Sequence, residues 1–228
     1  MKTKIKTPFR ERKNDKSGKA SREGQSAQIK AEEMLKQNGY IIPRETTTKE
    51  DKQGRDILIH DTEKSTKVLD HFFEKYGKTL SFDAKNAKRK IAKGKSRKNT
   101  DVSKTWTSLE LQNVYGGSGW LRPGKADLII FVTSSGEQIV ADRQEILEWL
   151  VKESPVSKDI EKLHKVGWSQ LEKGKDFVEH SADAEYKLYT RRYKFRNDNG
   201  SPKEDCITYV RYEDIKELKS TVILEKNS

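Results

Sequence analysis

Apolar positions along the chain change between helical and strand spacing, and this pattern predicts a mixed α/β domain. Ala27, Ala31 and Leu35 fall on one helical stripe, so an amphipathic helix is expected over residues 26–38, with Gly39 as its stop. Strands are predicted where polar and apolar residues alternate or a short apolar run occurs, at residues 40–42, 56–60, 79–86, 105–114, 126–132 and 137–141. The remaining elements of this region are a short helix or turn at 68–76 and an amphipathic helix at 142–151.

The chain divides into three unequal parts. Residues 1–22 carry nine Lys or Arg and almost no apolar residues, so they bury too little surface to fold and are predicted to be a disordered basic arm. Residues 23–152 hold the elements above and predict an α/β core, with a mixed central sheet flanked by helices. Residues 153–228 are predicted as an accessory segment, in which the alternation at 186–195 and 206–212 indicates a C-terminal β-hairpin followed by a short helix.

Two acidic residues and a lysine stand out within the predicted strands. Asp83 and Lys85 are two residues apart, so they point to the same face of a strand, and Asp56 begins another apolar strand. Strands disfavour Asp, so two of them among Ile, Leu and Phe need an explanation. Mg²⁺ prefers oxygen ligands, which makes Asp56 and Asp83 candidate ligands and the Ala84 carbonyl a candidate third. The structural alternative is a pair of charges at strand edges that face solvent.

This D…D-x-K pattern resembles the PD-(D/E)xK nuclease superfamily over about Gln25 to Leu150. Asp56 matches the first motif position, and Asp83 and Lys85 match the second, while Arg55 stands where many members have Pro. The resemblance implies a restriction-endonuclease-like core. It also implies Mg²⁺, with Mn²⁺ as a substitute, bound around the scissile phosphate, and Lys85 beside it to orient water or neutralise the phosphate.

Further residues are candidates for the same site. Glu110 and Gln112 share one face of the strand predicted at 105–114, which the resemblance places beside the catalytic strand. We expect Glu110 to complete the metal shell or to hold Lys85, and Gln112 to face DNA. Glu32 on the first helix, or Gln28 one turn earlier, is a further candidate for the metal shell. Solvent-facing positions are the alternative for these residues.

The charge of the chain indicates a polyanionic partner. Forty-seven Lys and Arg against 36 Asp and Glu give a net charge of +11 and a pI near 9.4. A cationic segment directly after the D-x-K strand is expected to grip the DNA backbone and includes Lys88, Arg89, Lys90, Lys93, Lys95, Arg97, Lys98 and Lys104. Arg191 and Arg192 on the hairpin are further candidates for phosphate contacts, although an ordinary half-buried hairpin with a basic outer face is favoured.

Several classes of protein are disfavoured by what the sequence contains. The longest apolar run, Leu128–Val132, is too short for a membrane span, and the N-terminus lacks the apolar stretch of a signal peptide. A single cysteine, Cys206, argues against a disulfide framework and fits a reducing cytoplasm. The four histidines show no metal-binding spacing. The Gly116–Gly119 segment lacks the Lys-Ser/Thr ending of a phosphate-binding loop.

These observations lead to the hypothesis of a metal-dependent DNA endonuclease of phage or bacterial type. A Holliday-junction or branched-DNA resolvase is a narrower version of this hypothesis, and it implies a homodimer. A non-catalytic nucleic-acid-binding protein that keeps the fold without the chemistry is the alternative from a different class.

Overall fold

The computed structural model describes residues 19–86, 105–112, 119–122, 124–133, 135–166, 188–196 and 202–225. The helices in these ranges are α1 (Lys19–Gln37), α2 (Thr48–Lys52), α3 (Asp70–Tyr76), α4 (Arg143–Lys152), α5 (Ser157–Val166) and α6 (Tyr212–Lys216). The strands are β1 (Ile57–His60), β2 (Thr79–Asn86), β3 (Trp106–Gln112), β4 (Leu128–Val132), β5 (Gln138–Asp142), β6 (Leu188–Arg196), β7 (Pro202–Arg211) and β8 (Val222–Leu224).

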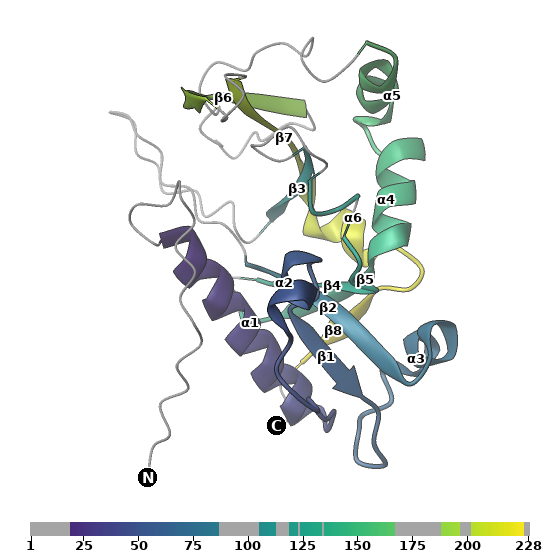
Figure 1. Cartoon of the computed structure of the whole chain (residues 1–228). Coiled ribbons are helices and arrows are strands. Elements are labelled where there is room, and N and C mark those ends of the chain that lie inside the picture. Colours follow the sequence, from purple (N-terminus) through teal and green to yellow (C-terminus); the bar gives the residue numbers. More distant parts are fainter. Residues whose placement is uncertain are drawn as a thin grey trace.

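A five-stranded mixed sheet forms the centre of the molecule (Figure 1). Its strand order is β1-β2-β4-β5-β8, in which β2 and β4 are parallel and every other neighbouring pair is antiparallel. Helix α1 lies against one side of this sheet, and α4 lies on the other side (Figure 1). The prediction of an α/β fold with a mixed central sheet flanked by helices is therefore confirmed.

The two faces of the central sheet belong to two different hydrophobic cores. Phe82 and Ala84 of β2 pack with α1 in the first core. Ile129 and Phe131 of β4 pack with α4 and α6 in the second core. Because side chains alternate along β2 and Asp83 pairs with Ile129, Asp83 and Lys85 point to the face of the second core.

The strand at Trp106–Gln112 does not adjoin the strand that carries Asp83, contrary to the expectation from the family resemblance. Strand β3 pairs with β7 in a separate three-stranded sheet of order β3-β7-β6. The physical reason is that β2 already has hydrogen-bonded neighbours on both sides, β1 and β4, so no edge remains there for β3. The predicted hairpin is present as the antiparallel pair β6 and β7.

The C-terminal part of the chain contributes strands to both sheets. Strand β7 pairs with β3, and β8 pairs with β5 through Val140 and Val222, so β8 forms an edge of the central sheet. Residues 153–228, predicted as an accessory segment, thus complete the sheet that carries Asp83. Helix α5 and strand β8 were not predicted. Strand β8 has three residues, which are too few to show an alternating pattern.

The beginning of the first helix also differs from the prediction. Helix α1 starts at Lys19, seven residues before the predicted start, so residues 19–22 are helical and do not belong to a disordered arm. Lys19, Ala20, Arg22 and Glu23 all favour helix, which explains the extension. Residues 1–18 of the predicted arm lie outside the described residues. The strand predicted at 40–42 is reduced to a single bridge between Ile41 and His60. None of the described helices is long and apolar enough to span a membrane.

A candidate catalytic site on the central sheet

Asp56 directly precedes β1 and lies beside β2. Its carboxylate accepts a hydrogen bond from a β2 backbone N–H, in the place of a carbonyl from a neighbouring strand. Its backbone N–H donates to the Phe82 carbonyl at 2.7 Å, and β1 begins at the next residue. The Asp56 carboxylate accepts a hydrogen bond from the Ala84 N–H at 3.0 Å. Asp83 lies close enough to Asp56 that its charge acts on the Asp56 carboxyl group. Because buried N–H groups require acceptors, the sheet itself fixes the Asp56 carboxylate beside Asp83.

Lys85 forms an ion pair with Asp83 along the same strand. The Lys85 Nζ lies 2.6 Å from the Asp83 Oδ1, and the Asp83 side chain is only 3% exposed whereas that of Lys85 is 26% exposed. Their two-residue spacing produces this contact directly, since it places both side chains on one face of β2. A carboxylate as buried as Asp83 requires a compensating charge, and Lys85 supplies it.

The carboxyl group of Asp56 titrates far above the usual range. Burial raises the pKa of Asp56 to about 7, and the neighbouring charge of Asp83 raises it in the same direction. The Lys85 ammonium and the hydrogen bond from Ala84 oppose this increase in part. Near neutral pH the Asp56 carboxyl group is therefore about half protonated.

Replacing Asp56 with Asn is expected to remove a pH dependence of stability. The folded pKa of about 7 lies above the ordinary value of 3.8, so the protonated form stabilises the fold fully below pH 4, and this stabilisation is lost as the pH rises through 7. The loss in wild type is on the order of 2–4 kcal/mol, and Asp56→Asn, which stays neutral, avoids it. Chemical denaturation between pH 4.5 and 8 without divalent cations measures the difference.

The control for this experiment is Glu148→Gln, which changes the net charge by the same amount at an exposed position on α4. Its stability curve is expected to run parallel to that of wild type. Parallel curves for Asp56→Asn and wild type would show that Asp56 does not take up a proton on folding.

Helix α1 supports the backbone of Asp56. The Gln28 side-chain amide donates to the Asp56 carbonyl at 3.0 Å and to the Glu32 carboxylate at 3.1 Å. Glu32 also lies 3.9 Å from the Lys36 Nζ. Of the two helix residues considered from sequence, Gln28 therefore contacts Asp56, and Glu32 contacts other residues of its own helix. The Thr46 hydroxyl donates to the same Asp56 carbonyl at 3.2 Å.

The turn before β1 lies against the Asp83 carboxylate. Gly54 has a φ of +73°, and a Cβ at this position would lie 3.4 Å from the Asp83 Oδ2. A side chain at Gly54 would therefore be strained by the backbone and would also contact Asp83. The turn is tied to the segment before β4 through Lys125. The Lys125 N–H donates to the Gln53 carbonyl at 2.9 Å, and the Lys125 carbonyl accepts from the Arg55 Nε at 2.9 Å.

Trp120 also contacts the site, through Lys85, and the sequence did not predict this contact. The Lys85 Nζ lies over the Trp120 ring, 4.5 Å from its centroid, which is cation–π geometry. The ring is partly buried against the second core. No sequence pattern indicated this contact, because residues 35 positions apart leave no periodic signal in the sequence.

The loop that carries Trp120 packs directly on β3. The Gly119 N–H donates to the Leu111 carbonyl at 2.9 Å, and the Leu121 N–H lies 3.5 Å from the Glu110 carbonyl. A Cβ at Gly119 would lie 2.2 Å from that same Glu110 carbonyl oxygen, so only glycine permits this approach. The second sheet therefore contributes to the site by holding the loop.

Arg143 at the start of α4 holds the loop from its other end. Its Nε donates to the Ala126 carbonyl at 2.8 Å, and one terminal guanidinium nitrogen donates to the Leu121 carbonyl at 2.9 Å. Gly124 is also confined, because a Cβ there would lie 2.5 Å from the Trp120 carbonyl oxygen. Contacts on both sides of Trp120 thus fix the backbone that presents its ring to Lys85.

Glu110 and Gln112 lie on β3, which belongs to the second sheet and does not adjoin β2. Within the described residues, no group of three or more His, Cys, Asp and Glu side chains is placed so that it could hold a metal. The third acidic ligand expected from Glu110 or Glu32 is therefore not in position. Two carboxylates still fit Mg²⁺, which keeps several waters and is often bound by one or two carboxylates.

The predicted DNA-binding residues are described only in small part. The segment with Lys88, Arg89, Lys90, Lys93, Lys95, Arg97 and Lys98 lies outside the described residues. Arg191 and Arg192 lie on β6, where their backbones pair in register with Asp205 and Glu204 of β7, and their side chains are not described.

Comparison of the chain with protein-family models, curated proteins and solved structures found no match. The arrangement of Asp56, Asp83, Lys85 and Trp120 is therefore the basis for assigning a function.

Proposed function

We propose that this protein is a divalent-metal-dependent nuclease that hydrolyses phosphodiester bonds in DNA. The observation that carries the proposal is the neighbouring pair of carboxyl groups, Asp56 and Asp83, with the Lys85 ammonium 2.6 Å from Asp83. Like charges held together cost free energy in a folded protein, and strongly shifted carboxyl groups cluster at functional sites, which makes this pair a candidate for an active site. The motif spacing and the mixed central sheet support a restriction-endonuclease-like, PD-(D/E)xK type of site.

The side chains divide into two roles. Asp56 and Asp83 would hold the metal, with the Ala84 carbonyl as an additional oxygen ligand. A bound Mg²⁺ lowers the pKa of its water and offsets charge on the phosphate. Lys85 orients the attacking water or stabilises the negative charge that develops on the phosphate oxygens. Gln28 and Thr46, through the Asp56 carbonyl, keep the first carboxylate in place.

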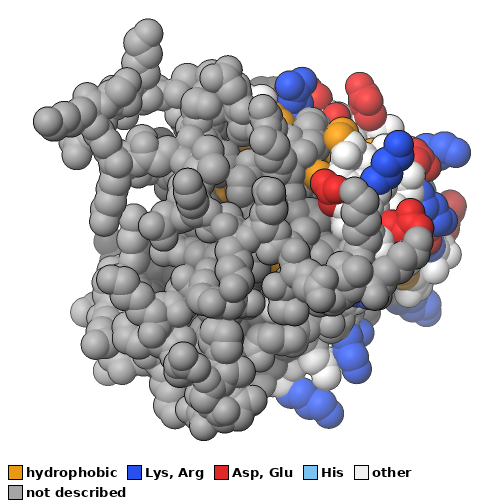
Figure 2. Space-filling model, turned by 90° about the horizontal axis from the view of Figure 1, so that it is seen from above, with side chains coloured by type: hydrophobic (Ala, Val, Ile, Leu, Met, Phe, Trp, Pro, Cys, Tyr) orange, Lys and Arg blue, Asp and Glu red, His pale blue; other side chains and the backbone are white. Residues whose placement is uncertain are grey.

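The distribution of charge along the sequence supports DNA as the substrate. Residues 1–18 carry seven Lys or Arg against two acidic residues, and residues 87–104 carry eight against one. The net charges of these two segments are +5 and +7, which together slightly exceed the +11 of the whole chain, so the rest of the chain is close to neutral. Consistent with this, Figure 2 shows Lys and Arg side chains interspersed with Asp and Glu where the face in view is described. Phosphate neutralisation by such segments is independent of sequence and sensitive to salt.

Incubation with DNA tests the proposed activity directly. Supercoiled plasmid, linear duplex, single-stranded and branched DNA are incubated with the full chain in Mg²⁺, in Mn²⁺ or in EDTA. Cutting of at least one substrate in metal, and none in EDTA, is expected. Selective cutting of branched DNA would identify a junction resolvase. Binding of every substrate without cutting would replace the nuclease proposal with the alternative below.

Divalent cations are expected to raise the melting temperature of the wild-type protein, and Asp83→Asn is expected to abolish this rise. The cation relieves the repulsion between Asp56 and Asp83, so it binds the folded state preferentially and stabilises it. Differential scanning fluorimetry with Mg²⁺, Mn²⁺ and Ca²⁺ measures the effect. The matched control is Asp127→Asn on the adjacent strand start, where the carboxylate accepts bonds from Ser81 and not from a second carboxyl group.

Asp127→Asn is expected to lower the melting temperature in all buffers and to keep the rise caused by metal. An unchanged metal response in Asp83→Asn would remove Asp83 from the proposed site.

A non-catalytic DNA-binding protein is the second candidate, favoured by the lack of a third acidic side chain near Asp56 and Asp83 in the described part of the chain. In this case the Asp83–Lys85 ion pair would be a structural element of β2. Such a protein would bind DNA with the same salt dependence and would show neither metal-dependent cutting nor a metal-dependent melting temperature.

A further inference from the structure

We infer that Trp120 is a positioning residue for Lys85, holding its ammonium group in place when Asp83 becomes a metal ligand. This inference rests on the proposed function. It adds a residue outside the D…D-x-K pattern and gives a role to the loop that joins the two sheets. It is carried by the 4.5 Å distance between the Lys85 Nζ and the Trp120 ring centroid, together with the contacts that fix the loop.

Lys85 has two partners of different kinds. One is the Asp83 carboxylate at 2.6 Å, and the other is the face of the Trp120 ring. In the proposed metal-bound state, Asp83 serves the metal, so Lys85 loses its carboxylate partner. The positive charge of the bound metal would also repel the Lys85 ammonium. A flexible lysine side chain without another partner would then move away toward solvent, because it has four rotatable bonds and prefers hydration.

The Trp120 ring is suited to hold the ammonium in that state. The face of an indole carries negative electrostatic potential, and Trp is the strongest of the aromatic partners for a cation. The ring attracts Lys85 but offers no oxygen to a metal, so it does not compete with Asp56 and Asp83 for the ion. Trp120 can therefore retain Lys85 after the ion pair with Asp83 is lost.

The loop provides the rigidity that a positioning residue needs. Gly119 rests on β3 with no room for a side chain, and Gly124 lies against the Trp120 backbone. Arg143 binds the loop carbonyls at Leu121 and Ala126. A ring held this firmly limits the positions open to the Lys85 ammonium, which is the condition for an oriented catalytic group.

Kinetics of Trp120 variants test the inference. Under single-turnover conditions with excess enzyme, Trp120→Leu is expected to slow cutting by about three- to thirtyfold, and the KM for DNA in the steady state is expected to be nearly unchanged. Trp120→Phe keeps an aromatic face and is expected to recover part of the rate. The matched control is Trp106→Phe, because Trp106 also lies beneath a cation, Arg211 at 5.2 Å, but on β3 in the second sheet. Its rate is expected to equal that of wild type.

A spectroscopic measurement separates positioning from a merely structural role. In protein with ¹³C-labelled lysine, the ring current of Trp120 shifts the Lys85 methylene protons upfield, and Lys85→Arg identifies their signal by its loss. The shift is expected to persist when Mg²⁺ or Ca²⁺ is added to wild type and to be missing in Trp120→Leu. Circular dichroism confirms that each variant is folded, and Trp120→Phe, which fills most of the same volume, serves if Trp120→Leu unfolds.

The outcomes distinguish the two proposals. Return of the Lys85 signal to an unshifted position on addition of metal would overturn the role of Trp120, whether or not the protein cuts DNA. Cutting by Trp120→Leu at the wild-type rate would also overturn it and would leave the nuclease proposal intact. Failure of the wild type to cut DNA would refute the nuclease proposal alone, because the response of the Lys85 signal to metal is still measured.

Discussion

Replacing Lys85 with Ala is expected to reduce metal-dependent DNA cutting by on the order of a hundredfold or more, while metal and DNA binding are retained. Lys85 shares a strand face with Asp83 but, as a cation, is not itself a metal ligand. Its contribution lies in the transition state, so its loss lowers turnover and leaves affinity nearly unchanged. Single-turnover cutting rates and DNA binding in Ca²⁺ measure the two effects separately.

The matched control is Lys216→Ala. Lys216 on α6 also forms an ion pair, 2.9 Å from Glu137, and its side chain is 29% exposed, close to the 26% of Lys85. Its removal is expected to leave the cutting rate unchanged. Lys85→Ala also leaves the buried Asp83 without a counter-charge, so its stability in EDTA is expected to fall and to recover in metal. A Lys85→Ala protein that cuts at the wild-type rate would show that the D-x-K assignment is wrong.

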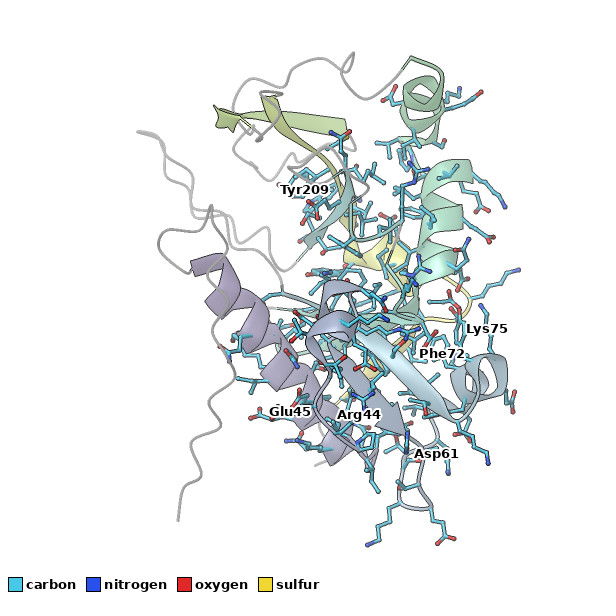
Figure 3. All side chains as sticks on the ribbon, in the orientation of Figure 1. Arg44, Glu45, Asp61, Phe72, Lys75 and Tyr209 are labelled. Carbon is cyan, nitrogen blue, oxygen red and sulfur yellow. The ribbon has the colours of Figure 1, made fainter. Side chains whose placement is uncertain are left out.

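Replacing Asp142 with Ala is expected to destabilise the fold by about 2–4 kcal/mol. The Asp142 side chain is fully buried and serves two elements at once. Its Oδ1 caps α4 by accepting the N–H groups of Gln144 at 2.8 Å and Glu145 at 3.1 Å. Its Oδ2 accepts from the Lys75 ammonium at 2.5 Å and the Tyr76 hydroxyl at 2.6 Å, with Lys75 reaching from α3 toward α4 (Figure 3).

These contacts also determine how pH acts on Asp142. Burial by itself raises the pKa of Asp142, but hydrogen bonds from Lys75, Tyr76 and the α4 backbone outweigh it and lower the pKa below the ordinary value. A lowered pKa means that this carboxylate stabilises the fold above its ordinary pKa and that the contribution is lost at more acidic pH. The difference in stability between wild type and Asp142→Ala is therefore expected to shrink below about pH 4.

Thermal unfolding measures the effect, and a fall of roughly 5–15 °C is expected for Asp142→Ala. Asp142→Asn keeps an oxygen for the cap and loses the charge, so its melting temperature is expected to lie between those of wild type and Asp142→Ala. The control is Glu148→Ala on α4. Glu148 and Lys152 are 3.6 Å apart and both more than half exposed, so the change is expected to stay within about 0.5 kcal/mol. Equal effects at both positions would contradict the role assigned to the buried carboxylate.

The strand that carries the candidate site was predicted from sequence with its observed bounds, Thr79–Asn86. Local geometry explains this success, because the period of two along a strand separates Phe82 and Ala84 from Asp83 and Lys85 without reference to any other part of the chain. The ion pair between Asp83 and Lys85 follows from the same spacing. The helix predicted at 142–151 is present as α4, and the structure shows Asp142 as its N-cap.

Contacts between distant segments were not predicted. Trp120 reaches Lys85 through a loop whose course is fixed by β3 and Arg143, and neither partner shows a pattern that signals the contact. The same holds for Glu110, which the resemblance placed beside the D-x-K strand although its strand pairs with β7. Strand neighbours are selected by which edges remain unpaired and which apolar faces must be covered, and these conditions involve the whole chain.

Sequence patterns alone were enough to locate the strands β1, β2, β4 and β5, the shared face of Asp83 and Lys85, and the two cationic segments that favour DNA. These features depend on backbone geometry and charge at neighbouring positions, which are fixed by the order of residues. The approach of Asp56 to Asp83, the contact between Trp120 and Lys85, and the pairing of β8 at the edge of the central sheet became apparent only from the folded chain. Those features depend on strand pairing and on burial between remote segments, where the free energy of packing the whole chain selects one arrangement among many.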